Sequence, residues 1–320
     1  MKEKKIRKKP VLLSVVICTH NRQDDLINAL NSLTGQITTR DDVELIIVDN
    51  QSSDGTADLL NQFCQGKHNI RSVYEEKIGL SNARNRGWRE AVGAFVGYTD
   101  DDALLPDQWV KTALEIIRQS KYPLFGGPYI PFYKLEKPIW FKDAYGSSYW
   151  LPDEERVLTD RYLVGGNMFI RRDLLESYGG FSEKYGMSGS NLRYNEETNF
   201  QIRLLKSEPQ TKIFFTPRLY IRHLVSDKKM QLSWPVKRYL KQGGDKFRSD
   251  KSNNLNPWNR LFLFNLAKIP VVLIIGFIDL GLLIIFRSRK KYPHWQNYIY
   301  ENIKRYAYQI GYAASALGIQ

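Results

Sequence analysis

The chain has 320 residues, of which 42% are hydrophobic and 13% aromatic, so it can bury a substantial core and is not a disordered protein. Lysine and arginine number 47 against 34 aspartates and glutamates, and the formal net charge of +13 predicts an anionic partner: nucleic acid, a membrane surface or a phosphorylated substrate. Much of the excess lies in residues 1–10, 228–251 and 287–291.

The cysteine content and the N-terminus indicate the compartment. Cys18 and Cys64 are the two cysteines, and each lies in or beside an apolar segment. This pattern predicts buried reduced thiols in the cytosol, not a disulfide framework or a metal site. The N-terminus is basic but lacks the apolar region and cleavage site of a signal peptide, so export is not expected.

The first part of the chain alternates apolar runs with amphipathic segments. VLLSVVICT, at 11–19, is the almost continuous β-branched run typical of a strand buried on both faces of a parallel sheet. Apolar residues at helical spacing follow it, and the pattern then recurs. The alternation predicts an α/β fold with an open parallel sheet. Further strands are expected at 43–49, 70–76 and 93–99. Helices are expected at 26–33, at 57–63 and at 79–91, and Gly79 opens the last of them.

Polar residues gather where the predicted strands end. In open α/β sheets the ligand crevice lies beyond the carboxyl ends of the strands, and Thr19–Arg22, Asp49 and Asp100–Asp102 fall there. Three adjacent carboxylates disfavour one another's ionised forms unless a cation compensates, and Mg²⁺-like ions prefer oxygen ligands. The run therefore predicts a metal–diphosphate site at a solvated strand end. The alternative is a solvated turn or helix N-terminus, because 101–110 leads into a predicted helix.

Four motifs occur in a characteristic order: VVICTHNR, IIVDNQSSDGT, GLSNARNRG and YTDDDA. This set resembles the family 2 glycosyltransferases, whose nucleotide-sugar-binding domain has the GT-A fold, and the resemblance extends from Val11 to about Leu240. It implies a mostly parallel, Rossmann-like open sheet flanked by helices; a C-terminal helical membrane-associating segment is expected on separate grounds, given below. It also implies a divalent metal, Mn²⁺ or Mg²⁺, and a nucleotide-sugar donor, with a UDP-sugar expected.

The resemblance also implies roles for the residues at the strand ends. Thr19 and Asn21 would line the nucleobase, Asp49 would read the base or ribose, and Arg84 and Asn85 would lie beside the nucleotide. An ordinary turn and a surface helix are the alternatives for Asp49 and Arg84. The expected nucleotide-binding residues are Thr19, Asn21, Arg22, Asp49, Arg84, Asn85, Asp100 and Asp101.

The expected metal ligands are Asp102, Asp100 and His223. Asp100 and Asp102 match the ends of the family's DxD motif, with Asp102 the stronger candidate for the metal and Asp100 for the ribose or a metal-bound water. Asp101 is expected to point elsewhere. His223, in LYIRHLVSD, resembles a histidine that reaches the metal or diphosphate in relatives, and a structural histidine is the alternative.

The expected catalytic base is Glu197. It lies with Glu196 in YNEETNFQIRL, which resembles the family's segment where the second acidic residue opens a helix and faces the acceptor. The alternative is a helix N-terminus enriched in acidic residues. GGNMFIRRDLLESYGGF, from Gly165, resembles the segment behind the sugar pocket, where glycines permit close backbone approach. The proline-rich and aromatic stretches 125–141 and 144–152 are expected to be loops around a cleft.

The C-terminal region contains an interrupted apolar segment, Leu261–Phe286. A spanning helix needs ~20 mostly apolar residues, and an aspartate such as Asp279 near its centre costs about 2.5–3.5 kcal/mol. Basic clusters at 237–251 and 287–291 flank the segment. A helical hairpin or interfacial helix with both ends cytoplasmic is therefore favoured, and a helix buried against the catalytic domain is the alternative.

The sequence thus predicts a basic tail (1–10), a GT-A domain (11–255, with nucleotide-binding and acceptor halves meeting at 122/123) and a membrane-associated segment (256–320). The expected activity is metal-dependent, inverting transfer of a hexosyl type, in cell-surface polysaccharide or glycolipid biosynthesis. The acceptor would be a saccharide or lipid-linked hydroxyl. The expected location is the cytoplasmic face of an anionic membrane, through a peripheral, re-entrant or single-span segment.

Two other function classes stay open. A nucleotidyltransferase or dinucleotide-binding enzyme is disfavoured because no G-x-G-x-x-G follows a predicted strand. A non-catalytic basic adaptor on a membrane or nucleic acid would show steeply salt-dependent DNA binding; no nucleic acid partner is expected. The QxxRW signature of the family's processive synthases is absent from the sequence, which favours addition of a single sugar.

Overall fold

The computed structural model describes residues 10–148, 152–183, 196–252 and 274–319. The described chain divides into two compact units, and each is treated by itself. The first unit contains both β-sheets. It comprises the described residues of 1–132, 143–189 and 195–224, and the second unit those of 133–142, 190–194 and 225–320.

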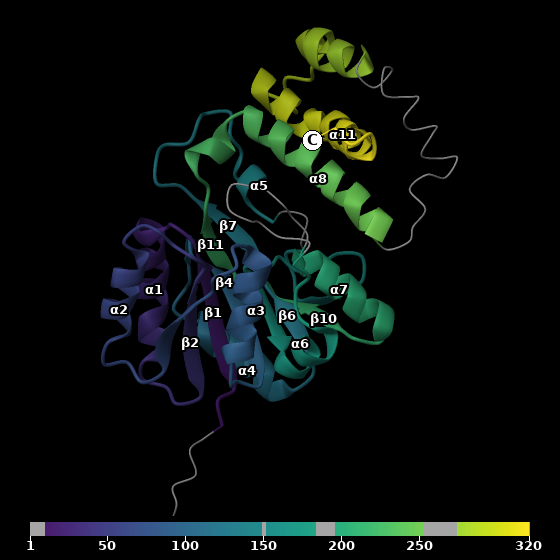
Figure 1. Cartoon of the computed structure of the whole chain (residues 1–320). Coiled ribbons are helices and arrows are strands. Elements are labelled where there is room, and N and C mark those ends of the chain that lie inside the picture. Colours follow the sequence, from purple (N-terminus) through teal and green to yellow (C-terminus); the bar gives the residue numbers. More distant parts are fainter. Residues whose placement is uncertain (1–9, 149–151, 184–195, 253–273, 320) are drawn as a thin grey trace, which may run out of the picture. The chain divides into compact units, whose positions relative to one another are not determined.

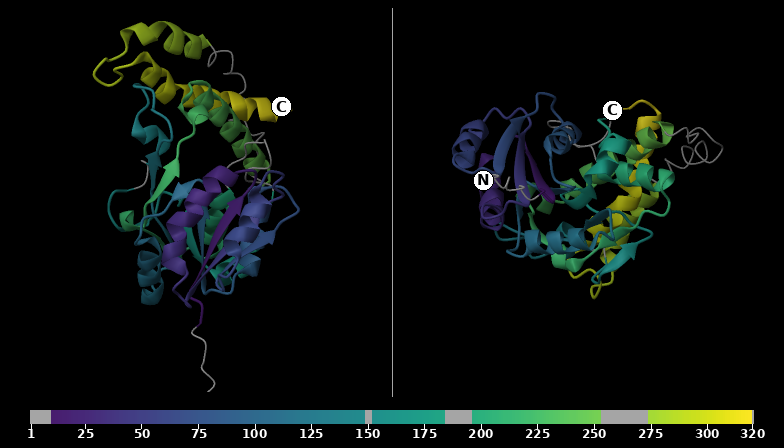
Figure 2. Two further views of the ribbon diagram at one scale, coloured as in Figure 1. Left: turned by 90° about the vertical axis from the view of Figure 1, so that its left-hand side faces the viewer. Right: turned by 90° about the horizontal axis from the view of Figure 1, so that it is seen from below.

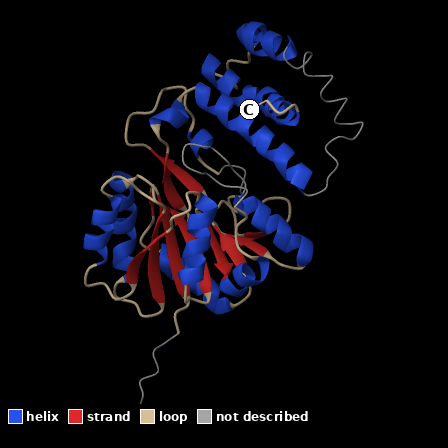
Figure 3. Cartoon of the chain, viewed as in Figure 1, coloured by secondary structure: helices blue, strands red, loops and turns tan. Residues whose placement is uncertain are grey.

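An eight-stranded sheet forms the centre of the first unit, with helices on both faces (Figure 1; Figure 3). The strand order is β3-β2-β1-β4-β9-β6-β10-β8. The strands are β1 (Leu13–Thr19), β2 (Val43–Asp49), β3 (Ile70–Tyr74), β4 (Phe95–Asp100), β6 (Leu124–Gly126), β8 (Arg156–Leu158), β9 (Asn167–Arg171) and β10 (Ile213–Phe215).

The apolar runs form strands because both faces of the sheet are covered. Successive residues of β1 alternate between two hydrophobic clusters: Val15 and Ile17 pack in one, and Val16 in the other. Helices α1 and α4 contribute to the first cluster, and α3, α6 and α7 to the second. Figure 2 shows the ribbon from two further sides. The helices are α1 (Gln23–Ile37), α2 (Thr56–Cys64), α3 (Leu80–Glu90), α4 (Trp109–Gln119), α5 (Asp143–Gly146), α6 (Arg172–Tyr178) and α7 (Glu196–Ser207).

The predicted strands and helices of the first hundred residues are confirmed. The central sheet is mostly parallel, as expected, but β9 runs antiparallel to β4 and to β6, and β8 runs antiparallel to β10. One expectation for the later part is wrong. The stretch expected to form only loops contains β6 and β7 (Tyr129–Phe132). These strands are too short, and too interrupted by glycine and proline, to give a periodic pattern.

The first unit also contains a three-stranded sheet with the order β5-β11-β7, and its strand β5 follows β4 almost directly in the sequence. It consists of β5 (Ala103–Leu104), β7 and β11 (Ile221–Leu224). β11 pairs antiparallel with β5 and parallel with β7. The pairing places His223 opposite Ala103, directly after the aspartate run, although the two residues are far apart in sequence.

Two helices, α8 (Ser233–Ser252) and α11 (Trp295–Ala316), pack together in the second unit. Glycines allow their backbones to approach: a Cβ on Gly243 would overlap the Tyr308 carbonyl oxygen, and one on Gly311 would overlap that of Leu240. Short 3-10 or π turns complete the described elements: η1 (Pro217–Leu219) in the first unit, and η2 (Asp227–Met230), η3 (Ile278–Leu282) and η4 (Leu283–Phe286) in the second.

The predicted apolar segment Leu261–Phe286 lies partly outside the described residues, since the description resumes at Ile274. Asp279, which interrupts the segment, is buried. It accepts hydrogen bonds from the hydroxyls of Tyr298 and Tyr306 and forms an ion pair with Arg305, all three on α11. Within the described ranges, every helix is too short or too polar to cross a bilayer.

Candidate active site

The carboxyl ends of β1, β2 and β4 lie side by side in the sheet. Their registers pair Thr19 with Asp49, and Cys18 with Asp100. The predicted convergence of these three strand ends at one edge of the sheet is therefore confirmed.

Cys18 and Cys64 are free and half-buried, and burial raises the pKa of the Cys18 thiol to about 12.

Asp100, Asp102 and His223 form a compact cluster at this edge. His223 Nε2 lies 3.3 Å from Asp102 Oδ1 and 3.6 Å from Asp100 Oδ2. One nitrogen or oxygen atom from each of the three side chains can be chosen so that all lie within 4.8 Å of one another. Two carboxylates and an imidazole facing one point are a donor set suited to a divalent cation such as Mn²⁺.

The middle aspartate takes part in a different contact. Arg22 Nη1 donates to Asp102 Oδ2 at 2.7 Å and to Asp101 Oδ1 at 3.2 Å. Burial and the nearby Asp102 charge raise the pKa of Asp101 to about 7, although Arg22 opposes the shift. The expectation that these aspartates are solvated is wrong for Asp101 and Asp102, which are both buried because β5 and β11 continue beyond β4.

The loops after β1 and β2 are joined to each other. Asn21, with a φ of 53°, accepts a hydrogen bond from the Ser53 amide at 2.7 Å, and its own amide donates to Ser52 Oγ at 3.0 Å. Asp49 is buried and accepts from the Ser52 amide at 2.9 Å. Asparagine tolerates the left-handed conformation, so its side chain can bridge the two loops.

Arg84 connects the end of β4 with the start of α7. It is buried in α3 and is not on a surface helix, the alternative that the sequence left open. Its Nη1 donates to Glu196 Oε1 at 2.5 Å, and its Nη2 lies 3.9 Å from Asp100 Oδ1. Since Glu196 is buried as well, this is a desolvated ion pair between two segments 112 residues apart.

Glu197 differs from its neighbour Glu196 in its burial. It is only half-buried, whereas Glu196 is buried against Arg84. Burial and the Glu196 charge raise the pKa of Glu197 to about 8, and the Arg84 charge opposes this shift. A carboxyl group with such a pKa can accept a proton near neutral pH.

Asn85 is not brought to the aspartate cluster. Its side chain donates to the Phe181 carbonyl at 2.7 Å and accepts from the Phe181 amide at 2.8 Å and from Trp88 Nε1 at 3.1 Å. These contacts use the amide group to fix α3 against the turn after α6.

The two glycines before β9 allow the backbone to lie close to two side chains of the site. A Cβ on Gly166 would overlap the Asp100 carboxylate, and one on Gly165 would overlap the Arg84 guanidinium. Tyr129, which the sequence did not single out, also touches Asp100: its hydroxyl donates to Oδ2 at 2.7 Å. Its only sequence signal was its place in a glycine- and proline-rich stretch.

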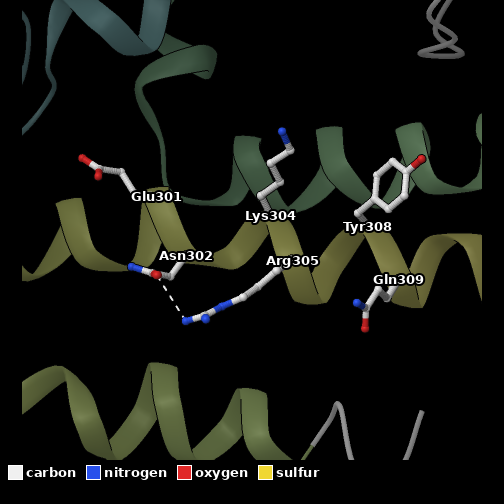
Figure 4. A pocket seen from close by; sticks show the side chains of 6 residues that line it. All are labelled: Glu301, Asn302, Lys304, Arg305, Tyr308 and Gln309. Carbon is white, nitrogen blue, oxygen red and sulfur yellow. Dashed lines mark hydrogen bonds between the residues drawn. The ribbon is translucent and has the colours of Figure 1, made fainter. Parts of the chain in front are cut away.

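A groove in the second unit runs along α11 and contains none of the predicted site residues (Figure 4). The side chains along it carry both signs of charge. The lining residues are Glu301, Asn302, Lys304, Arg305, Tyr308 and Gln309.

Comparison with known proteins identifies related enzymes. The model of the family described as "Glycosyl transferase family 2" matches residues 14–179, just over half of the chain. Glycosyltransferase AglE of Haloferax volcanii is 28% identical over 170 residues, covering 53% of this chain and 55% of that protein. The glucosyl-dolichyl phosphate glucuronosyltransferase of the same organism is 24% identical over 243 residues, covering 73% and 76%. The chain thus spans about half the length of the first relative.

Solved structures agree in fold. The mannosyltransferase PcManGT of Pyrobaculum calidifontis, in complex with GDP-Man and Mn²⁺, has a TM-score of 0.61 at 17% identity, over 99% of this chain and 92% of that chain. S. aureus TarS in complex with UDP has a TM-score of 0.53 at 16% identity, over 96% and 92%. The expected GT-A fold, with a mostly parallel central sheet flanked by helices, is confirmed. The chain belongs to glycosyl transferase family 2, as its ordered motifs predicted, and is a glycosyltransferase.

Proposed function

We propose that this glycosyltransferase is metal-dependent and inverting, and that it transfers one sugar from a nucleotide donor to a hydroxyl of a saccharide or lipid-linked acceptor. We place it in cell-surface polysaccharide or glycolipid biosynthesis. The observation that carries the proposal is the convergence of Asp100, Asp102 and His223 at the carboxyl edge of the sheet, within 4.8 Å of one another.

The metal would be held by these three side chains. Mixed carboxylate and imidazole donors suit Mn²⁺ well, and Mg²⁺ is the alternative. A divalent cation bound there supplies positive charge that stabilises the departing nucleoside diphosphate. Arg22 binds Asp101 and Asp102 from the side, so it limits repulsion among the carboxylates and orients Asp102.

The nucleotide would lie over the ends of β1 and β2. Thr19, Asn21 and Asp49 are the residues proposed to line the base and ribose, and the Asn21–Ser53 bond supports a preformed loop there. A UDP-sugar is the proposed donor. The solved neighbours were crystallised with GDP-Man and with UDP, so guanosine nucleotides are the first alternative to measure.

Glu197 is the proposed general base. It would remove the proton from the acceptor hydroxyl, and a single base acting on one face of the donor sugar accounts for inversion. Glu196 is proposed to act through Arg84, since their buried pair fixes the first turn of α7. Asn85 would support the same region by holding Phe181.

The second unit is proposed to bind the surface of an anionic membrane. Between Ile274 and Phe286, several large apolar side chains are exposed, and basic residues follow directly. Apolar burial at the acyl boundary combined with attraction to anionic headgroups is the energetic basis of interfacial binding. The exposed side chains are Ile274, Ile275, Phe277, Ile278, Ile285 and Phe286, and the basic ones Arg287, Arg289, Lys290 and Lys291.

The proposal is tested by screening the full chain with UDP- and GDP-sugars, each with Mn²⁺ and with excess EDTA. Ligand that binds the native state at 100 times its Kd stabilises it by about 2.7 kcal/mol, so the melting temperature should rise for one donor with Mn²⁺ only. The anomeric configuration of the released or transferred sugar, read by NMR, tests inversion. A chain that no nucleotide sugar stabilises in the presence of Mn²⁺ would overturn the proposal.

A further inference from the structure

We propose that Tyr129, on β7, is a positioning residue that sets the orientation of Asp100 and His223, two of the three side chains assigned to the metal. The inference rests on the proposed metal site and adds a residue that the sequence motifs do not point to. It is carried by three contacts of the Tyr129 side chain.

The first two contacts fix the direction of the phenol hydrogen. The Gly166 amide donates to the Tyr129 hydroxyl oxygen at 2.9 Å, and the hydroxyl donates to Asp100 Oδ2 at 2.7 Å. Because the oxygen already accepts from a backbone amide, its own hydrogen points to the carboxylate. A phenol ordinarily has a pKa of about 10, so its hydroxyl keeps this hydrogen at neutral pH.

The third contact is with the imidazole. The Tyr129 ring stacks on His223 with the centroids 4.7 Å apart and the planes 7° from parallel. The pairing of β7 with β11 creates this contact, since Tyr129 lies opposite Ile221, two residues before His223. A flat stack of this kind restricts the rotation of the imidazole and keeps Nε2 directed toward Asp100 and Asp102.

The surroundings of Asp100 leave it few other orientations. Gly166 is so close that a Cβ there would overlap the carboxylate, and Arg84 lies 3.9 Å from Oδ1, the oxygen that Tyr129 does not bind. Tyr129 is therefore the neutral donor that decides where Oδ2 points. Partners of metal ligands that orient them in this way typically change metal affinity by about 10–100-fold when they are removed.

The test measures Mn²⁺ binding to the full chain, without nucleotide, by the EPR signal of free Mn²⁺. Tyr129→Phe keeps the ring and removes the hydroxyl, and we expect the Kd for Mn²⁺ to rise at least about tenfold. Replacing Tyr129 by 4-aminophenylalanine restores an N–H donor at the same place and should return the Kd to within about threefold of wild type. Tyr178→Phe, which removes a hydroxyl bound to the exposed Glu208 carboxylate, is the matched control and should bind Mn²⁺ like wild type.

A second readout separates positioning from folding. With a nucleotide-sugar donor, Tyr129→Phe should need more Mn²⁺ for half-maximal rate but regain most of kcat at saturating Mn²⁺. An unchanged Kd in Tyr129→Phe, or a 4-aminophenylalanine chain that binds as weakly as the phenylalanine one, would overturn the inference. So would a Tyr129→Phe chain that unfolds in EDTA, because Tyr129 would then belong to the fold. If the wild-type chain itself binds no Mn²⁺, the proposed metal dependence fails, and the role of Tyr129 fails with it; an unchanged Kd in Tyr129→Phe overturns the role of Tyr129 alone.

Discussion

Adjacent residues in this chain can have the same side chain and different chemistry. Glu196 and Glu197 begin α7 together, yet Glu196 is buried against Arg84 and Glu197 is half-buried with a raised pKa. For Glu197→Gln we expect kcat to fall roughly 10²-fold or more, with donor affinity unchanged, because the amide keeps the size but cannot accept the proton. Steady-state kinetics and donor titration measure the two effects.

The control for this change is Glu208→Gln, an exposed glutamate just beyond the end of α7. Glu196→Gln is not a silent control. It removes the charge that faces Arg84 at 2.5 Å, and breaking a buried ion pair costs about 3–5 kcal/mol, so it should lower the melting temperature. If Glu197→Gln retained wild-type turnover with both substrates saturating, the proton acceptor would be another group.

The pH dependence of kcat follows from the same carboxyl group. A general base works in its ionised form, and the pKa of Glu197 is raised to about 8 by burial and by the Glu196 charge, while the Arg84 charge lowers it. Turnover should therefore increase with pH and reach half of its plateau near pH 8, whereas an ordinary glutamate would already be ionised at pH 6. A pH–rate profile that is flat from pH 6 to 9 would contradict this assignment.

The aspartate run offers a pair of isosteric variants that separate two roles. Asp102→Asn should lower Mn²⁺ affinity at least about 100-fold, because it removes a charged ligand from the cluster with His223. Asp101→Asn changes a residue whose contact is Arg22, and we expect it to retain Mn²⁺ affinity within about tenfold. Calorimetry with Mn²⁺ alone compares them; equal losses in both variants would show that the cluster is wrongly assigned.

At the residue scale, the sequence could locate the strand-end groups but not their partners. Asp49 and Asp100 were predictable because parallel strands bring their carboxyl ends to one edge. The Arg84–Glu196 pair joins α3 and α7 across 112 residues, and the Tyr129 contacts depend on a short strand in an irregular stretch. Neither leaves a local pattern, since both arise from tertiary packing.

Among the elements, the packing of α8 on α11 gives a stability prediction. Gly311→Ala places a methyl group against the Leu240 carbonyl, so the two helices must separate, and the melting temperature of the second unit should fall. Gly35→Ala, in α1 with nothing within 4 Å of the new Cβ, is the matched control. Since alanine is favoured over glycine in helices by about 0.5–1 kcal/mol, the control should be neutral or stabilising. A Gly311→Ala chain as stable as that control would contradict close packing of α8 on α11.

The apolar segment of the second unit gives a membrane prediction. Phe277→Glu combined with Phe286→Glu should weaken binding to vesicles of anionic phospholipid by about tenfold or more per residue, because each exposed ring contributes about 1.5 kcal/mol or more when buried. Val92→Glu, at an exposed apolar position of the first unit, is the control. Wild-type sedimentation of the double variant with vesicles would place the contact elsewhere.

The elements differed in how well the sequence predicted them. β1, β2 and β4 are buried on both faces and have six or seven residues each, so their apolar runs are unambiguous. β6 to β10 have three to five residues each, and the antiparallel insertion of β9 between β4 and β6 depends on pairing between distant segments. An interrupted apolar segment was visible, but its aspartate is held by α11, a long-range contact that hydropathy does not report.

For the whole molecule, the division into units decides how the membrane contact can be studied. The second unit includes 133–142 and begins again at Val225, and α8 packs on α11. Removing residues 261–320 would therefore expose the apolar face of α8. If the truncated chain lost membrane binding, either the missing apolar segment or the disturbed packing of α8 could be the cause. Substitutions confined to exposed side chains avoid this ambiguity.

The central claim is that nucleotide binding in the first unit depends on a cation held by Asp100, Asp102 and His223. The most direct measurement is calorimetric titration of UDP and of GDP into the full chain, once with Mn²⁺ and once with EDTA. We expect one of the nucleotides to bind with Mn²⁺, and its affinity to fall at least about tenfold in EDTA, since the diphosphate then loses its counter-charge. Binding of equal strength with and without the metal, or binding of neither nucleotide under either condition, would contradict the account.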